Sequence, residues 1–124
     1  YETGGEEEVS PRFFEGIAAG AVVLGAPPRC AAYDRCFDWP DAVIPTAAHG
    51  GQIAALMAEL EANPRRIAQM RRDNVVNALQ RHDWAYRWRW ILDSVGLAPS
   101  RKMVEREERL ESMARAVGAG LPDR

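Results

Sequence analysis

The sequence has little cysteine and little histidine. Its 124 residues include two of each: Cys30, Cys36, His49 and His82. Two cysteines cannot build a disulfide framework, they do not form a CxxC pair, and the spacing of the four residues matches no zinc-finger pattern. We therefore expect no metal and no cofactor, and two reduced thiols, which are typical of a cytoplasmic protein.

An excess of positive charge and a long apolar run are also missing. The chain carries 16 Lys and Arg against 18 Asp and Glu, a formal net charge of −2. Because nucleic-acid phosphates are bound through a clear basic excess, this balance argues against a nucleic-acid-binding protein. No apolar run approaches the roughly 20 residues of a transmembrane helix. The 47% hydrophobic and 27% charged residues instead predict one ordinary globular domain.

The first half of the chain predicts one helix and two short strands. Ser10 can cap a helix that begins with Pro11, and Gly20 is placed to end it. The apolar run 21–25 is bounded by glycine and proline and fits a buried strand, and 42–45 is a second, shorter candidate. We expect the segment between the strands, with both cysteines, to be a loop.

The second half predicts four helices. An apolar stripe at helical spacing indicates a helix over 51–62. Asn63 followed by proline opens the next helix, to about Arg81, Asp83 caps another that Gly96 closes, and Ser100 caps a last, charged one. The thin apolar stripe of this last helix, over 101–117, predicts docking on a partner or partial fraying.

The helix that begins after Asp83 is apolar on two sides. One stripe comprises Trp84, Trp88, Ile91, Leu92 and Val95, and the other side carries Tyr86 and Trp90. Apolar residues on both sides predict that both are covered. We expect the longer stripe to pack on this domain and Tyr86 with Trp90 to meet another domain or chain. The alternative function of this helix is to stack nucleic-acid bases on its Trp and Arg side chains. The net negative charge of the chain disfavours it.

The order of elements predicts an α/β domain with a short parallel sheet and mostly helices. Two strands bury too little to be stable alone, and parallel strands with open edges are unusual. We therefore expect this chain, which begins at Tyr1, to be the C-terminal piece of something larger or to complete its sheet with another chain.

The first predicted helix is the best candidate for a site. A helix start collects free N–H groups and partial positive charge, which suits a diphosphate. Glu15 lies about one turn inside, where a carboxylate can accept hydrogen bonds from vicinal hydroxyls such as those of ribose. Gly16 and the small residues after it keep the helix slim, so that a ligand or strand can approach closely. The alternative is a plain packing helix with Glu15 in solvent.

Two other polar features have simpler interpretations. The basic cluster Arg65, Arg66, Arg71 and Arg72 predicts a solvated helix face, with Arg71 lying along apolar neighbours. His49 follows the second strand, where open α/β sheets bind ligands, although a polar turn residue explains it as well.

The run RFFEGIAAG at 12–20, followed by AVVL, resembles the C-terminal domain of group 1 glycosyltransferases of the GT-B fold. It is most similar to the subfamily that includes the glycosyltransferase-like domain of spore maturation proteins. The resemblance continues through FDWP at 37–40, the helix that follows Asn63, and the HDW turn at 82–84, and covers about residues 7–97. It implies that 1–98 is the C-terminal part of a Rossmann-like nucleotide-sugar-binding domain and that 99–124 is a charged helical tail.

The resemblance also implies site residues. The family pattern has two glutamates with seven residues between them, the later one contacting the donor ribose and the earlier one near the sugar. Glu15 matches the later glutamate, and Glu7 stands at the distance of the earlier one, although within a run of three glutamates. The glycines usual between them are absent here, so Ser10 and Arg12 are the candidates for contacting the donor phosphates.

Metal-independent glycosyl transfer from a nucleotide sugar to an unidentified acceptor is the activity that the resemblance implies. The cleft would be completed by an N-terminal Rossmann-like domain or by another copy of the chain, and we expect the chain alone to be inactive. The catalytic residues are not identified. Two alternatives stay open: a non-catalytic nucleotide-binding or scaffold module of the same fold, and a helical interaction module that uses Tyr86, Trp90 and the 101–117 helix.

Overall fold

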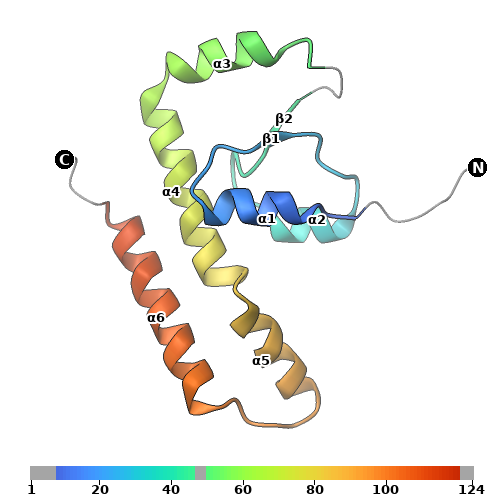
Figure 1. The fold of residues 1–124 in the computed structure, drawn as a ribbon, viewed down its shortest axis with the longest axis vertical. Coiled ribbons are helices and arrows are strands. Elements are labelled where there is room, and N and C mark those ends of the chain that lie inside the picture. Colours follow the sequence, from blue (N-terminus) through green and yellow to red (C-terminus); the bar gives the residue numbers. More distant parts are fainter. Residues whose placement is uncertain (1–7, 47–49, 121–124) are drawn as a thin grey trace, which may run out of the picture.

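The computed structural model describes residues 8–46 and 50–120, and within these ranges it is mostly helical with a two-stranded parallel sheet (Figure 1). The elements in chain order are α1 (Pro11–Ala18), β1 (Leu24–Gly25), α2 (Ala31–Cys36), β2 (Ile44–Pro45), α3 (Ile53–Glu61), α4 (Pro64–Arg81), α5 (Trp84–Ser94) and α6 (Arg101–Gly118). The predicted α/β class with a short parallel sheet is confirmed. None of the described helices combines the length and apolar character needed to cross a membrane.

Helix α1 begins and ends as its sequence predicts. The Ser10 hydroxyl accepts a hydrogen bond from the backbone N–H of Arg12 at 3.4 Å, and Pro11 occupies the first helical position. After the last turn Gly20 adopts a φ of +66°, a left-handed conformation that glycine takes without a steric penalty. The chain then turns directly into the sheet.

The sheet is shorter than the two apolar runs suggested. Leu24 pairs with Ile44 and Gly25 with Pro45, in parallel. The register is held by backbone hydrogen bonds from Ile44 N–H to the Val23 carbonyl and from Thr46 N–H to the Gly25 carbonyl, both 2.8 Å. The sheet is therefore a minor part of the fold, and the helices supply most of the packing.

Helix α2 lies where the sequence predicted a loop, and this part of the prediction is wrong. Cys30, at its N-cap position, makes no side-chain capping bond, so the segment carries little local helix signal. Its aromatic residues pack instead. Tyr33 stacks on Phe37 with ring centroids 5.1 Å apart, and Phe13 of α1 meets Phe37 edge-on at 5.9 Å. Contacts with α1, distant in sequence, thus account for a helix that propensity did not indicate.

Helix α4 is the centre of the molecule, with α1 on one side and α6 on the other (Figure 1). Asn74 in its middle is fully buried; its side chain accepts a hydrogen bond from Trp39 Nε1 at 3.0 Å and donates one to the Ala21 carbonyl at 2.9 Å. The described core has two clusters: Ile17, Phe37, Ala42, Val43 and Ala78; and Ile44, Leu60 and Met70. Helix α4 contributes to both and so joins them.

The arginines of α4 were expected to form a solvated face; Arg71 is exposed, as is Arg65, whereas Arg66 is half-buried. The Arg66 guanidinium donates to both carboxylate oxygens of Asp41 at 2.9 Å and to Glu59 at 2.8 Å. This pairing lowers the pKa of Asp41, mainly through the hydrogen bonds from Arg66. Arg71 Nε donates to the Gly20 carbonyl at 2.8 Å. These side chains therefore hold neighbouring segments against α4, because each reaches an acceptor brought close by the fold.

Helix α6 lies along α4 (Figure 1), with Leu110 and Ala114 buried. Leu110 of its apolar stripe thus packs on its own chain, while Met113 of the same stripe is 48% exposed. Arg89 of α5 also pairs with Glu107 of α6, with Nε and Oε1 3.0 Å apart. The predicted division into 1–98 and 99–124 stays a prediction.

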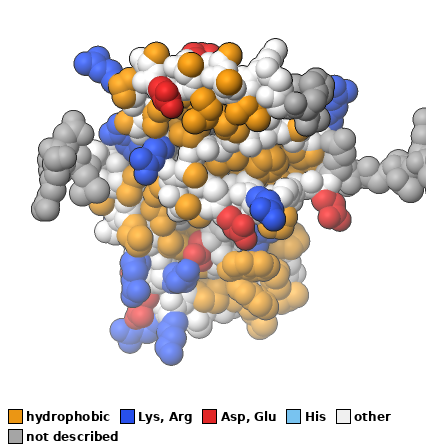
Figure 2. Space-filling model, turned by 45° about the horizontal axis from the view of Figure 1, so that its top comes forward, with side chains coloured by type: hydrophobic (Ala, Val, Ile, Leu, Met, Phe, Trp, Pro, Cys, Tyr) orange, Lys and Arg blue, Asp and Glu red, His pale blue; other side chains and the backbone are white. Residues whose placement is uncertain are grey.

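The two sides of α5 are not arranged as predicted. The stripe expected to pack on the domain is largely solvent-exposed, with Trp84 69%, Trp88 54% and Val95 64% accessible. Tyr86, expected to face outward, is half-buried and donates its hydroxyl to the Leu79 carbonyl at 2.9 Å. Trp90 is 72% exposed, as expected for the outer side. Figure 2 shows hydrophobic side chains gathered on the surface in the α5 region.

Candidate functional site

Glu15 lines a surface hollow between α1 and the start of α5. This Glu15 hollow has a volume of about 370 Å³ and is lined by Val9, Pro11, Phe14, Glu15, His82, Trp84 and Arg87. Among the described residues, none makes a hydrogen bond or ion pair with the Glu15 carboxylate. The carboxylate is therefore available to a ligand, and the predicted role of Glu15 stays a prediction.

Arg87 provides the positive charge of the Glu15 hollow. Its guanidinium lies over the Phe14 ring, 5.7 Å from the centroid, and over the Trp84 ring at 5.3 Å. These cation–π contacts hold the side chain without neutralising it. An anionic group in the hollow can therefore pair with Arg87, while hydroxyl groups can donate to Glu15.

His82 forms the inner wall of the hollow. Its Nε2 is 2.9 Å from the Cys36 carbonyl oxygen, and because a carbonyl only accepts, Nε2 carries the proton. Its ring stacks near Phe37 and meets Phe14 edge-on, with centroids 5.1 Å apart in the second pair. Burial lowers the pKa of His82, the nearby Arg81 and Arg87 lower it further, and the bond to Cys36 opposes them. The neutral imidazole thus acts as a fixed wall near neutral pH.

The sequence did not indicate His82, Trp84 or Arg87 as companions of Glu15. They lie about seventy residues later, and only the fold of α4 against α1 brings them together. The one available signal was the HDW turn quoted for the family resemblance, which ends three residues before Arg87. That signal marked the segment and carried no information on which side chains face Glu15.

Ser10 and Arg12 lie at the start of α1, and neither lines the Glu15 hollow. The Ser10 hydroxyl takes up the Arg12 N–H, the Ser10 carbonyl accepts from Phe13 N–H at 3.1 Å, and Pro11 has no N–H. The first N–H groups of the helix are therefore already bonded. A phosphate at this helix start would have to displace the Ser10 hydroxyl, while the exposed Arg12 side chain remains available.

Gly16 faces the segment that enters β1. A Cβ added at Gly16 would lie 2.8 Å from Cγ2 of Val23, closer than side chains tolerate. The close packing of α1 on this segment thus explains a glycine here without a ligand. Glu7 and His49 lie outside the residues that the structure describes.

Comparison with protein families identifies the family of this chain. A family model described as glycosyl transferase-like matches residues 2–93. The chain belongs to the glycosyl transferase-like family. Comparisons with curated proteins and with solved structures gave no significant match.

The family match spans α1 to most of α5, and so it includes every described residue that lines the Glu15 hollow. Family membership points to a transferase that takes a sugar donor. The predicted similarity to glycosyltransferases is confirmed at the level of the family. The similarity to the spore maturation subfamily stays a prediction.

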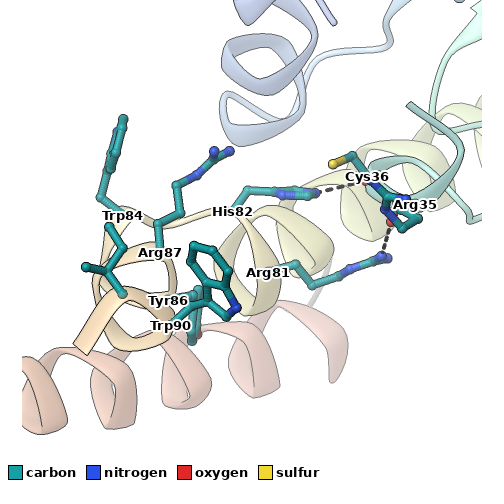
Figure 3. Close-up of a pocket in the computed structure, with 9 residues that line it drawn as sticks. Arg35, Cys36, Arg81, His82, Trp84, Tyr86, Arg87 and Trp90 are labelled. Carbon is teal, nitrogen blue, oxygen red and sulfur yellow. Dashed lines mark hydrogen bonds between the residues drawn. The ribbon is translucent and has the colours of Figure 1, made fainter. Parts of the chain in front are cut away.

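A second, larger cavity of the glycosyl transferase-like domain lies on the other side of His82. This α4–α5 cavity, shown in Figure 3, has a volume of about 560 Å³. It shares His82, Trp84 and Arg87 with the Glu15 hollow. Within the described ranges, 8–46 and 50–120, no group of three or more His, Cys, Asp and Glu is placed to hold a metal ion.

Proposed function

We propose that this chain is the donor-binding part of a GT-B glycosyltransferase, most similar to the spore maturation subfamily, and that it binds the nucleotide end of a sugar-nucleotide donor. The observation that carries the proposal is the Glu15 carboxylate on the same hollow as the Arg87 guanidinium. Glycosyl transfer would be completed by an N-terminal Rossmann-like domain, and the chain alone would be inactive. The acceptor is not assigned by this proposal.

Glu15 and Arg87 would divide the recognition of the donor. The Glu15 carboxylate would accept hydrogen bonds from the two ribose hydroxyls, since an ionised carboxyl group is acceptor-only. Arg87 would pair with the diphosphate, because a guanidinium binds phosphate oxygens with charge-assisted hydrogen bonds. A volume of about 370 Å³ accommodates part of the donor and leaves the rest to the surfaces beside it.

The other predicted residues have secondary places in the proposal. Arg12 is exposed at the helix start and would add a second contact to the phosphates. Ser10 would contribute a hydroxyl if the donor displaces its capping bond. Gly16 would act by letting α1 pack closely on Val23, and Glu7 keeps its predicted place near the sugar.

Substitution of Glu15 tests the proposal. We expect Glu15→Gln to weaken the binding of a nucleoside diphosphate such as UDP or GDP by about 1–3 kcal/mol, because hydrogen bonds to a charged group are lost. Isothermal titration calorimetry measures the affinity, and urea unfolding should show an unchanged stability, since Glu15 is exposed. Glu108→Gln is the matched control, being an exposed glutamate on α6 away from the hollow.

Comparing Arg87→Gln with Arg12→Ala identifies the arginine that binds phosphate. The responsible variant should weaken nucleoside diphosphates more than the free nucleoside. Equal affinity of Glu15→Gln and the unsubstituted chain, together with loss of binding on substituting Glu7 or His49, would place the site elsewhere.

A non-catalytic interaction module is the second candidate function. The observation that favours it is the exposure of three tryptophans on α5: Trp84, Trp88 and Trp90. Absence of nucleotide binding at millimolar concentration would make this candidate the better one.

A further inference from the structure

The α4–α5 cavity is lined by an unusual set of side chains for a surface of a net-negative protein. Arg35 comes from α2, Arg81 from the end of α4 and Arg87 from α5. No carboxylate belongs to the lining within the described residues, although the chain as a whole has 18 Asp and Glu. Three arginines from three separate elements therefore line one cavity; in Figure 3 Arg81 extends toward Arg35, and Arg87 lies on the α5 side.

The three arginines are differently engaged. Arg81 donates to the Arg35 carbonyl at 2.7 Å and pairs with Asp38, and its guanidinium lies 5.5 Å from the Trp39 ring centroid. Arg35 and Arg87 have no ion-pair partner among the described residues. Arg35 and Arg87 thus give the lining two unpaired positive charges, and the bonds of Arg81 fix the position of a third. This excess of positive charge favours an anionic ligand.

Aromatic rings supply the other part of the lining. The Trp90 indole is 72% exposed and lines the cavity on the α5 side, as Figure 3 shows. The Tyr86 ring is fixed by the hydrogen bond from its hydroxyl to the Leu79 carbonyl. An exposed indole beside guanidinium groups offers a face for stacking a planar ring. A volume of about 560 Å³ lies within the range of small-molecule sites.

We propose that the α4–α5 cavity is a second ligand site, which binds a small molecule that carries an anionic group on an aromatic ring. Arg35 and Arg87 bind the anionic group, and Trp90 stacks on the ring. The site adjoins the Glu15 hollow at His82, Trp84 and Arg87 but has its own residues in Arg35 and Trp90. Because Arg87 is also assigned to the donor diphosphate, a nucleotide bound at Glu15 and a ligand in this cavity would compete for its guanidinium.

The test uses phenyl phosphate as the probe and NMR of the whole chain as the measurement. At 13.8 kDa the chain gives resolved indole N–H signals, which the Trp90→Ala and Trp88→Ala spectra assign. We expect phenyl phosphate to shift the Trp90 indole in a saturable way and to leave the Trp88 indole unshifted, since Trp88 does not line the cavity. Inorganic phosphate and phenol, as separate probes, should each bind about ten-fold more weakly, because each offers half of the contacts.

Substitutions complete the test. Arg35→Gln and Trp90→Ala should each weaken phenyl phosphate by about five-fold or more, the loss of one charged or stacking contact. Arg65→Gln and Trp88→Ala are the matched controls, exposed residues outside the cavity, and should leave the affinity unchanged. Both test residues lie at the surface, and unchanged spectra elsewhere in the chain show that folding is retained.

Three results would overturn this proposal: no saturable shift of Trp90, equal affinity in all four variants, or equal affinity for inorganic phosphate and phenyl phosphate. Its failure is distinguishable from failure of the donor proposal. A chain that binds UDP with a Glu15 dependence but not phenyl phosphate would overturn the second site alone. The opposite result would overturn the donor proposal alone.

Discussion

The middle of α4 buries a polar side chain, and the outer side of α5 exposes a large aromatic one. Asn74 is completely buried and its amide joins Trp39 to Ala21, whereas Trp90 is 72% exposed and lines a cavity. A polar residue thus lies inside and a large aromatic outside. Asn74 can be buried because its amide has hydrogen-bond partners. Trp90 is exposed because no element of the described chain covers it. The α1–α4 region provides stability, and the α5 end provides the surfaces available for binding.

The largest effect is expected where the buried amide is removed. Asn74→Ala should lower the free energy of unfolding by about 2–4 kcal/mol, because it leaves Trp39 Nε1 and the Ala21 carbonyl unpaired and opens a small void. Urea unfolding measures the change. Asn77→Ala is the control on the same helix; its amide bonds only to Asp73 one turn earlier, so the loss should be smaller.

An equal loss in both asparagine variants would contradict the special role of Asn74. It would also weaken the comparison between the α1–α4 region and α5, since a buried polar link would then contribute no more than an ordinary one.

Crowding α1 against the sheet should have a smaller effect. Gly16→Val should lower the free energy of unfolding by about 1–3 kcal/mol, since its first side-chain carbon would lie 2.8 Å from Val23. Adding Val23→Ala should restore part of the loss. Urea unfolding of both variants measures the rescue. Without such a rescue, crowding against Val23 is not the cause of the loss.

The smallest effect concerns the ion pair between Asp41 and Arg66, which lies near the N-terminal end of α4. Asp41→Asn removes the charge that pairs with Arg66 and retains a residue that tolerates the φ of +58° found there. The folded-state pKa of Asp41 is below its ordinary value of 3.8, so the pair stabilises fully above that pH and loses its effect as the pH falls through the folded-state pKa. Both side chains are about one-third exposed, 34% and 32%, so we expect a loss of at most about 1 kcal/mol at pH 7.

Urea unfolding from pH 7 to pH 2.5 checks the Asp41 prediction. The difference between Asp41→Asn and the unsubstituted chain should shrink below about pH 4. A difference that stays constant into acid would show that the charge pair is not its origin.

The sequence predicted those parts of the fold that depend on local chemistry. Ser10, Asn63, Asp83 and Ser100 each cap the helix that they were expected to cap, because side-chain capping acts within three residues. Helix α2 was missed because its stability comes from aromatic contacts with α1. The orientation of α5 was wrong because periodicity shows that two faces are apolar and does not show which one finds a neighbour.

The same distinction applies to the candidate site. Glu15 could be identified from its place in a helix and a motif. His82, Trp84 and Arg87 could not, since their position beside Glu15 depends on the packing of α4 against α1. The free N–H groups assumed for the start of α1 were also an overestimate, because Ser10 already engages them.

The turn that follows α1 has a consequence for the order in which the chain can fold. The carbonyls of Gly20 and Ala21 are taken up by Arg71 and Asn74, 51 and 53 residues later. Until α4 is present, the turn after α1 lacks these two partners and α1 is an isolated helix of 8 residues, a length that is unstable in water on its own. During synthesis, Glu15 therefore cannot be held in place before α4 has left the ribosome.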